Sequence, residues 1–124
     1  MGKRILVVED QEDNRRILRD LLTSVGYEII EATTGEEGVT MAETGHPDLI
    51  LMDIQLPGID GYETTRRVRA LPGLGQVPII AVTSYALSGD DVKAMEAGCT
   101  DYVPKPFSPR ALLAKIRKYV PQNI

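Results

Sequence analysis

Short runs of consecutive apolar residues alternate along the chain with segments in which apolar residues recur every three or four positions. The first run, Arg4-Ile5-Leu6-Val7-Val8, predicts a buried strand, and the helical spacing of Ile17, Leu18, Leu21, Leu22 and Val25 predicts the helix after it. The same alternation continues to the end of the chain. It predicts further strands over residues 27–31, 48–53, 77–83 and 102–103, and further helices over residues 35–45, 61–71, 89–97 and 109–120.

Residues that favour helix ends stand at the ends of these predicted helices. Gly26 follows the first helix and suits the left-handed conformation in which many helices stop. Thr34 and Glu37 have the spacing of a capping box, in which a hydroxyl and a carboxylate bind the first free amides of a helix. Ser88 and Ser108 are suited to cap the fourth and fifth helices. These signals support five strand-helix units.

Strands that are apolar at consecutive positions are covered on both faces, as in a parallel sheet whose crossovers are helices. We therefore expect one α/β domain over residues 1–124, with a doubly wound parallel sheet of five strands. In such sheets, ligands bind beyond the carboxyl ends of the strands, where the direction of winding reverses. The polar residues that follow the predicted strands are therefore the candidates for function.

Length and composition narrow the possible classes of protein. The 124 residues carry a net charge of −4, which argues against a general nucleic-acid binder because such proteins need clustered Lys and Arg. A single cysteine, Cys99, excludes an internal disulfide framework. The apolar runs are far shorter than a membrane span, and the N-terminus has no apolar signal region. We therefore expect a cytoplasmic protein that binds neither nucleic acid nor membrane.

Three carboxylates follow two of the predicted strands. Glu9 and Asp10 come directly after the first strand, and Asp53 ends the third. Carboxylates gathered at one sheet edge repel one another, so they either share a proton or hold a hard cation, and a set of oxygen ligands suits Mg²⁺. An aspartate beside such an ion can attack a phosphoryl group. Lys105 after the fifth strand and Thr83 at the end of the fourth would supply a cation and a hydroxyl for the phosphoryl oxygens.

Each of these residues also has an ordinary structural explanation. A single aspartate at a strand end is most often a turn former, and Asp10 could simply cap the first helix. The combination of strand-end positions is harder to explain in this way. We interpret His46 as a solvated loop residue and Cys99 as a small buried residue. Arg15, Arg16 and Arg19 alternate with acidic residues, which favours a solvated helix face, and Arg66, Arg67 and Arg69 are a weaker candidate for a partner contact.

Four segments resemble the receiver domain of two-component response regulators. They are Glu9-Asp10, Met52-Asp53-Ile54-Gln55-Leu56-Pro57-Gly58-Ile59-Asp60-Gly61, Val82-Thr83-Ser84 and Gly98-Cys99-Thr100-Asp101-Tyr102-Val103-Pro104-Lys105-Pro106-Phe107. They occur in the family's order and spacing across nearly the whole chain. The resemblance implies a flavodoxin-like sheet with strand order 2-1-3-4-5. Because no output domain follows the fifth helix, it also implies a stand-alone regulator similar to CheY and DivK.

The resemblance assigns a role to each candidate residue. Asp53 would accept a phosphoryl group from a sensor histidine kinase or a histidine phosphotransfer protein. Asp10, Asp53 and the backbone carbonyl of Gln55 would hold Mg²⁺, with Glu9 acting through water. Lys105 would pair with the phosphoryl group.

A switch is implied as well. The Thr83 hydroxyl would move to the phosphoryl group and Tyr102 would swing inward, which would change the surface of the fourth helix, fifth strand and fifth helix for a downstream protein target. The Lys105-Pro106 bond would be cis. Such a protein would catalyse only its own phosphorylation and dephosphorylation. Tyr85, which is bulky for its place beside the phosphoryl site, would obstruct the attacking water together with the Gln55 amide and so slow loss of the phosphoryl group.

Other functions remain open at this point. A hydrolase of the haloacid dehalogenase type would need a second aspartate two residues after the nucleophile, where this chain has Gln55. A flavodoxin-like cofactor binder would need a phosphate loop after the first strand, but four of the five residues from Glu9 to Asp13 are acidic. The chain could also be the receiver part of a hybrid kinase, or a receiver that no longer accepts phosphate.

Overall fold

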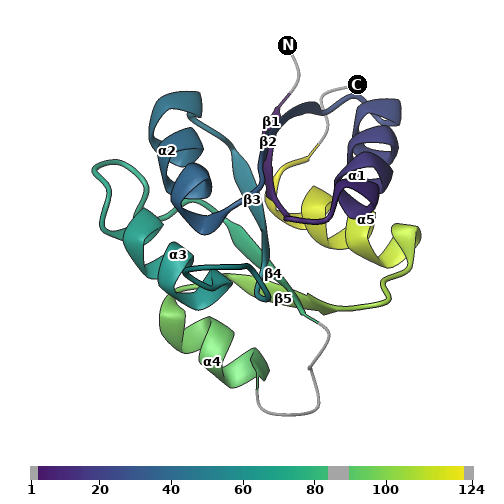
Figure 1. Ribbon diagram of the computed structural model, residues 1–124. Helices are drawn as coiled ribbons and strands as arrows, with labels where there is room; N and C mark the ends of the chain where they lie inside the picture. Colours follow the sequence, from purple (N-terminus) through teal and green to yellow (C-terminus); the bar gives the residue numbers. More distant parts are fainter. Residues whose placement is uncertain (1–2, 84–89, 122–124) are drawn as a thin grey trace.

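The computed structural model describes residues 3–83 and 90–121, which form five strands and five helices in strict alternation (Figure 1). The strands are Arg4–Val8 (β1), Glu28–Ala32 (β2), Leu49–Asp53 (β3), Ile79–Thr83 (β4) and Asp101–Pro104 (β5). The helices are Glu12–Ser24 (α1), Gly35–Gly45 (α2), Gly61–Arg69 (α3), Asp90–Ala97 (α4) and Pro109–Tyr119 (α5). The order predicted from the apolar pattern is therefore confirmed.

All five strands are parallel and lie in the order β2-β1-β3-β4-β5. The chain adds β2 on one side of β1 and then β3, β4 and β5 on the other, so the winding direction reverses between β1 and β3. This is the doubly wound fold that the sequence predicted. The reversal point brings the ends of β1 and β3 together at one edge.

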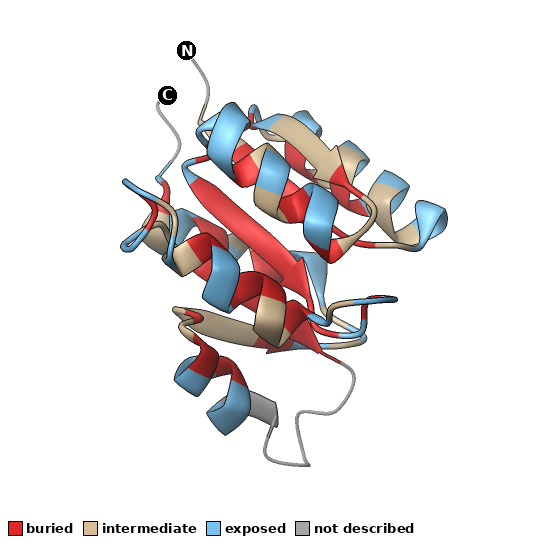
Figure 2. Cartoon of the chain, turned by 60° about the vertical axis from the view of Figure 1, so that its left-hand side comes forward, coloured by how far each residue is buried: buried red, intermediate tan, exposed pale blue. Residues whose placement is uncertain are grey.

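Helices cover both faces of the sheet, α1 and α5 on one and α2, α3 and α4 on the other (Figure 1). Because successive strand residues point to opposite faces, each central strand contributes to two cores. Leu6, Val8, Ile50 and Met52 belong to one core. Ile5, Val7, Leu49 and Leu51 belong to the other. Figure 2 shows the buried strands between helices whose outer faces are exposed.

Several helix caps follow the sequence prediction. The Thr34 hydroxyl accepts the Glu37 amide at 3.0 Å, and Ser108 caps α5 ahead of Pro109. The reciprocal bond of the predicted capping box runs from the Thr33 amide to Glu37, one residue earlier than expected. Gly26 has a φ of 94°, as its predicted role requires. The Ser88 cap lies outside the described residues.

The structure differs from the prediction at several element ends. β4 begins at Ile79 rather than at residue 77, β5 extends over Asp101–Pro104 rather than two residues, and α3 ends at Arg69 rather than at residue 71. Strand length depends on pairing with the neighbouring strand, which the apolar pattern does not encode. Within the described ranges, no helix combines the length and apolarity that a bilayer crossing requires.

Candidate functional site

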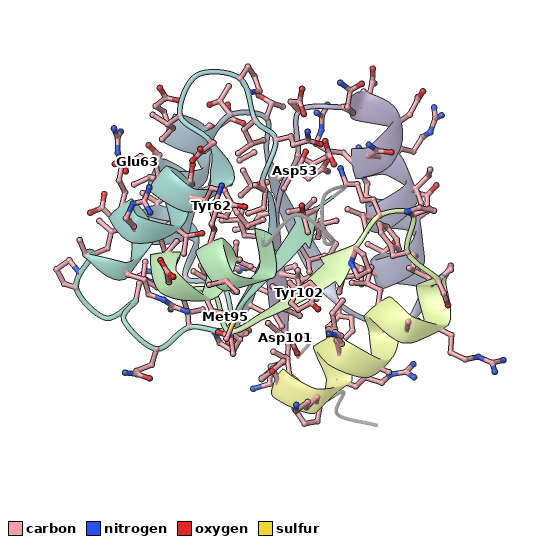
Figure 3. All side chains as sticks on the ribbon, turned by 90° about the horizontal axis from the view of Figure 1, so that it is seen from below. Asp53, Tyr62, Glu63, Met95, Asp101 and Tyr102 are labelled. Carbon is pink, nitrogen blue, oxygen red and sulfur yellow. The ribbon has the colours of Figure 1, made fainter. Side chains whose placement is uncertain are left out.

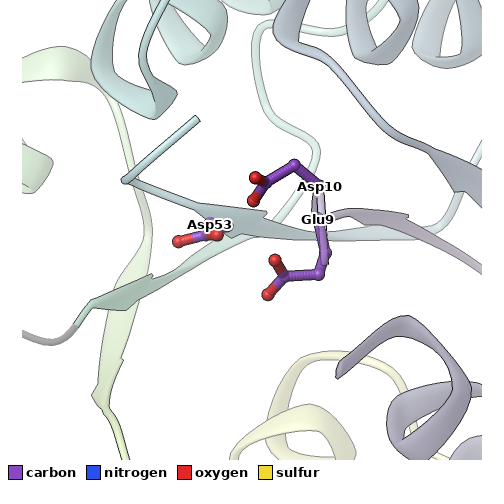
Figure 4. Close-up of side chains that lie close together, drawn as sticks. All are labelled: Glu9, Asp10 and Asp53. Atoms are coloured by element: carbon purple, nitrogen blue, oxygen red, sulfur yellow. The ribbon is translucent and has the colours of Figure 1, made fainter. Parts of the chain in front are cut away.

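Three carboxylates meet where β1 and β3 end. Val8 pairs with Met52, so Glu9 and Asp10 leave β1 beside Asp53, the last residue of β3. Figure 4 shows the three side chains gathered at this edge, and one ligand oxygen from each lies within 4.8 Å of the others. The sequence predicted this convergence, and the parallel register produces it.

Two of these carboxylates are almost completely buried. Glu9 is 2% exposed and Asp53 is 4% exposed. A buried carboxylate is costly unless it is paired and hydrogen-bonded. Each accepts a backbone amide, Glu9 from Gln11 at 3.0 Å and Asp53 from Gln55 at 3.1 Å. Both carboxylates therefore lie in a region that water reaches poorly.

Lys105 supplies positive charge to both buried carboxylates. Its Nζ lies 3.3 Å from Glu9 Oε1 and 3.4 Å from Asp53 Oδ1. Its backbone amide donates to the Thr83 carbonyl at 2.7 Å, which ties the end of β5 to the end of β4, and the Lys105-Pro106 peptide bond is cis, as expected. Among the described residues, Lys105 contacts Glu9 and Asp53 but not Asp10, so its single charge does not balance the three carboxylates. Oxygen ligands at this spacing fit a divalent cation such as Mg²⁺.

Thr83 is fully buried at the end of β4, one residue beyond the Val82 that pairs with Asp53. The structure therefore brings Thr83 and Lys105 to the same edge as the carboxylates. Ser84 and Tyr85 lie outside the described residues, so the expected effect of Tyr85 stays a prediction. The ligand role of the Gln55 carbonyl is likewise untested.

Tyr102 lies away from this edge, on the surface between α4 and α5 (Figure 3). It is half-buried and lines a shallow pocket with Val92, Met95, Glu96 and Asp101. Lys115 from α5 lies 5.3 Å from the centre of the Tyr102 ring and donates to the Tyr102 carbonyl at 2.7 Å. The ring also packs against the core beneath α4, and its expected inward swing stays a prediction.

Asp101 connects Tyr102 to α5. Its carboxylate accepts bonds from Lys115 at 2.9 Å, from Tyr119 at 3.0 Å and from the Tyr102 amide at 2.8 Å. Burial raises the pKa of Asp101, but these three donors together outweigh burial and hold the pKa below its ordinary value. Burial is the largest cause that raises the pKa of Tyr119. The hydrogen bond to Asp101 and the negative charge of that carboxylate raise it further.

The structure contradicts the ordinary structural explanation of Asp10 and agrees with those of His46 and Cys99. Asp10 does not cap α1, because the N-cap is Gln11 and no side chain accepts a capping bond there. His46 is exposed at the end of α2, and Cys99 is buried beside Thr65, both as interpreted. Burial raises the pKa of the Cys99 thiol.

The arginines of α1 are not simply a solvated face. Arg16 does pair with Asp13 of the same helix at 3.2 Å. Arg15 and Arg19, however, reach across to Glu31 on β2. The helix pattern alone could not reveal this partner, because it depends on how α1 packs over the sheet.

The arginines of α3 also have partners within the chain. Arg66 and Arg67 both pair with Glu63, so they do have a local acid. Arg69 donates to the carbonyls of Gly98, Leu74 and Val77, which joins α3 to the loops around it. These bonds give Arg69 a structural role within the chain.

Gly61 was not singled out from the sequence, although it brings α3 against the site. A Cβ at this position would overlap the Asp53 carbonyl oxygen and would lie 2.7 Å from the Ile54 Cα. The Gly61 amide donates to the Ile54 carbonyl at 2.9 Å, and Asp60 caps α3 by accepting the Glu63 amide at 2.9 Å. The first turn of α3 is thus built directly on the end of β3.

Comparisons with known proteins agree with this geometry. The family model described as the response regulator receiver domain matches residues 5–117. The polar-differentiation response regulator DivK of Brucella ovis is 41% identical over 120 residues, which cover 97% of this chain and 98% of that protein. This relative confirms the resemblance to DivK that the sequence suggested.

Solved structures give the same result. The receiver domain of a sensor histidine kinase from Pseudomonas aeruginosa, whose structure has a magnesium ion coordinated in the active site cleft, is 39% identical with a TM-score of 0.90, covering 96% of this chain and 98% of that one. The chemotaxis protein CheY4 of Vibrio cholerae is 26% identical with a TM-score of 0.92, covering 97% and 100%. With the family model and DivK, these matches show that the chain belongs to the receiver domain family of two-component response regulators.

Proposed function

We propose that this receiver domain takes a phosphoryl group onto Asp53, with Mg²⁺ bound beside it, from a sensor histidine kinase or a histidine phosphotransfer protein. The convergence of Glu9, Asp10 and Asp53 within 4.8 Å, facing the ammonium of Lys105, carries the proposal. In this reaction a carboxylate oxygen of Asp53 bonds to phosphorus while the phosphorus–nitrogen bond of the donor breaks, leaving its electron pair on the imidazole. No other substrate is turned over.

Asp10 and Asp53 would hold the metal directly, with the Gln55 carbonyl as a third protein ligand and Glu9 acting through water. When bound, Mg²⁺ neutralises charge on the phosphoryl oxygens as they approach the carboxylates. The similar Pseudomonas aeruginosa receiver has a magnesium ion coordinated in its active site cleft, which supports Mg²⁺ as the metal. Lys105 already touches Glu9 and Asp53, so its ammonium needs little movement to meet a phosphoryl oxygen. Thr83 would supply a hydroxyl to another oxygen.

The phosphoryl donor would reach Asp53 through a groove beside it. It has a volume of about 420 Å³ and lies between α1 and the segment that follows β5. Ile17, which is 55% exposed, lines it with Phe107 and Pro109, and Glu9, Asp53 and Lys105 belong to the same lining. An apolar groove that includes the phosphoacceptor in its lining is suited to the phosphohistidine helix of a kinase or phosphotransfer protein.

The phosphoryl group would then act as a switch. It replaces a single carboxylate charge with roughly −2 and three strong acceptors, which is enough to bias a two-state element. Movement of Thr83 toward the phosphoryl group would open space for Tyr102, which is half-buried, to turn inward. The surface formed by α4, β5 and α5 would change in consequence, and a downstream protein target would read that change.

The test is incubation with Mg²⁺ and acetyl phosphate, followed by intact-mass measurement. The wild type should gain one phosphoryl group, about 80 Da, only when Mg²⁺ is present, since an uncompensated acidic site repels phosphate. Asp53→Asn should gain none. Asp13→Asn, which removes an exposed carboxylate on α1, is the matched control and should behave as the wild type. Absence of any adduct on the wild type would overturn the proposal.

A further inference from the structure

Arg15 joins three parts of the site region. It lies in the first turns of α1, and its side chain is only 15% exposed. One nitrogen, Nη1, donates to the carbonyl of Glu9 at 3.0 Å and to the carbonyl of Asp10 at 3.1 Å. Its Nε lies 3.4 Å from Oε1 of Glu31 on β2. The guanidinium therefore connects a strand of the sheet to the backbone of the acidic turn.

These bonds fix the two peptide planes on either side of the Asp10 Cα. A carbonyl whose direction is held by a donor cannot rotate without breaking that bond, so the backbone dihedrals of Asp10 are restrained. The direction of the Asp10 side chain from the backbone is restrained with them. Glu9 does not depend on this contact in the same way, because its amide donates to the Ala32 carbonyl and its carboxylate accepts the Gln11 amide.

The Asp10 carboxylate has little else to orient it. Among the residues that the structure describes, its hydrogen-bond partner is the Gln11 side-chain amide, at 3.4 Å. That distance is long for such a bond, and the contact is exposed. The position of this carboxylate therefore depends mainly on the backbone beneath it. Arg15 holds that backbone at the Glu9 and Asp10 carbonyls, and the Glu9 carboxylate holds the Asp10–Gln11 peptide at the Gln11 amide.

Glu31 in turn holds Arg15. It sits opposite Val7 in the register of β1 and β2, one pair before the end of both strands. Its carboxylate binds Arg15 and Arg19 together. A guanidinium fixed by a carboxylate on a rigid strand keeps its donors aimed, much as outer-shell groups orient the ligands of a metal.

We propose that Arg15 is a positioning residue for the metal: with Glu31 behind it, Arg15 holds the acidic turn so that Asp10 faces Asp53. This inference depends on the proposed Mg²⁺ site. Loss of outer-shell partners typically weakens metal binding by about 10- to 100-fold. Arg15→Met keeps the aliphatic stem and removes every donor, so the dissociation constant for Mg²⁺ should rise about 10-fold.

Arg19 provides the matched control. It lies on the same helix and binds the same Glu31 through two contacts, at 2.8 and 3.1 Å. Within the described residues, the Arg19 side chain makes no hydrogen bond to a carbonyl of the acidic turn. Arg19→Met therefore removes a comparable ion pair and should change the Mg²⁺ dissociation constant less than about 2-fold. An effect of general destabilisation would appear in both variants.

The measurement is a Mg²⁺ titration of the unphosphorylated protein, followed by the NMR shifts of the Gln11 and Gln55 amides. The same titration is then made on the Asp10→Asn variant, with and without Arg15→Met. If Arg15 acts through Asp10, most of its effect should disappear there, whereas a merely structural role would persist. Should Arg15→Met fail to fold, Arg15→Lys keeps the charge without the planar fork, and its dissociation constant should rise at least about 3-fold.

The outcomes separate this inference from the proposed function. If the wild type binds Mg²⁺ and both Met variants bind it equally well, the role of Arg15 is wrong while the metal site stands. An effect of Arg15→Met that is unchanged in the Asp10→Asn background also refutes it. If the wild type shows no Mg²⁺-dependent shifts, the metal site itself is wrong, and the positioning role falls with it.

Discussion

Gly61 offers the sharpest test of how the fold supports the site, through the substitution Gly61→Ala. The added Cβ would overlap the carbonyl oxygen of Asp53 and lie 2.7 Å from Ile54 Cα and 3.0 Å from the Asp53 carbonyl carbon. All three are backbone atoms at the end of a buried central strand, so they have no rotamer into which they could move. Either the first turn of α3 or the end of β3 must shift.

The size of the effect follows from two opposing terms. Forcing an extra carbon into a packed region typically costs about 1–3 kcal/mol. Replacing glycine by alanine in a helix returns roughly 0.5–1 kcal/mol of backbone entropy. The difference spans about 0–2.5 kcal/mol, and because the clash is with backbone atoms that cannot move aside, the expected net loss is about 1–2 kcal/mol. With a urea m-value of about 2 kcal/mol/M, the unfolding midpoint should fall by roughly 0.5–1 M.

Urea unfolding followed by circular dichroism at 222 nm measures this shift, and Gly75→Ala is the control. A Cβ at Gly75 would meet nothing within 4 Å, so that variant should unfold at or slightly above the wild-type midpoint. A second reading is the rate of phosphorylation by acetyl phosphate, which should fall in Gly61→Ala because Asp53 moves. If Gly61→Ala unfolds at the same urea concentration as Gly75→Ala, the close approach of α3 to Asp53 is not tight, and the reasoning fails.

Three further predictions concern other parts of the chain. Because its folded-state pKa is lowered, Asp101 should stabilise the fold fully above its ordinary pKa of 3.8 and lose that contribution as pH falls through the lower folded value. The stability gap between wild type and Asp101→Asn in acid titrations should therefore shrink below about pH 4, and a gap that widens there would contradict the assignment. Thr34→Ala should lower the unfolding free energy by about 1 kcal/mol through loss of the α2 cap, as measured in urea, whereas an unchanged value would mean that the cap is dispensable. Cys99 should resist iodoacetamide at pH 8 until urea unfolds the protein, because burial both covers the thiol and raises its pKa; rapid labelling of the folded protein would refute this.

Local chemistry made several features predictable. The consecutive apolar residues from Ile5 to Val8 are shielded from water only if both faces of their strand are covered. The apolar pattern therefore predicted strands that alternate with covering helices. The caps at Thr34 and Ser108 depend on a hydroxyl a few residues from its amide, which is a short-range relation. The candidate site was predictable for a related reason, since the carboxyl ends of parallel strands share one edge.

Other features depend on contacts between residues far apart in the chain. The lengths of β4 and β5 follow from their pairing with each other and with β3. The need for glycine at position 61 appears only when α3 meets β3, and Arg15 finds Glu31 only when α1 lies across β2. These residues carry no local pattern that distinguishes them from an ordinary helix glycine or a solvated arginine.

The sequence by itself therefore determined which elements form and which strand ends carry the carboxylates, the lysine and the threonine, because these depend on residues near one another along the chain. Tertiary structure alone decided how the acidic edge is held in place. Arg15 clamps the carbonyls of Glu9 and Asp10, and Gly61 lets α3 rest on Asp53. Both depend on distances between elements, which are set only when the helices pack against the sheet.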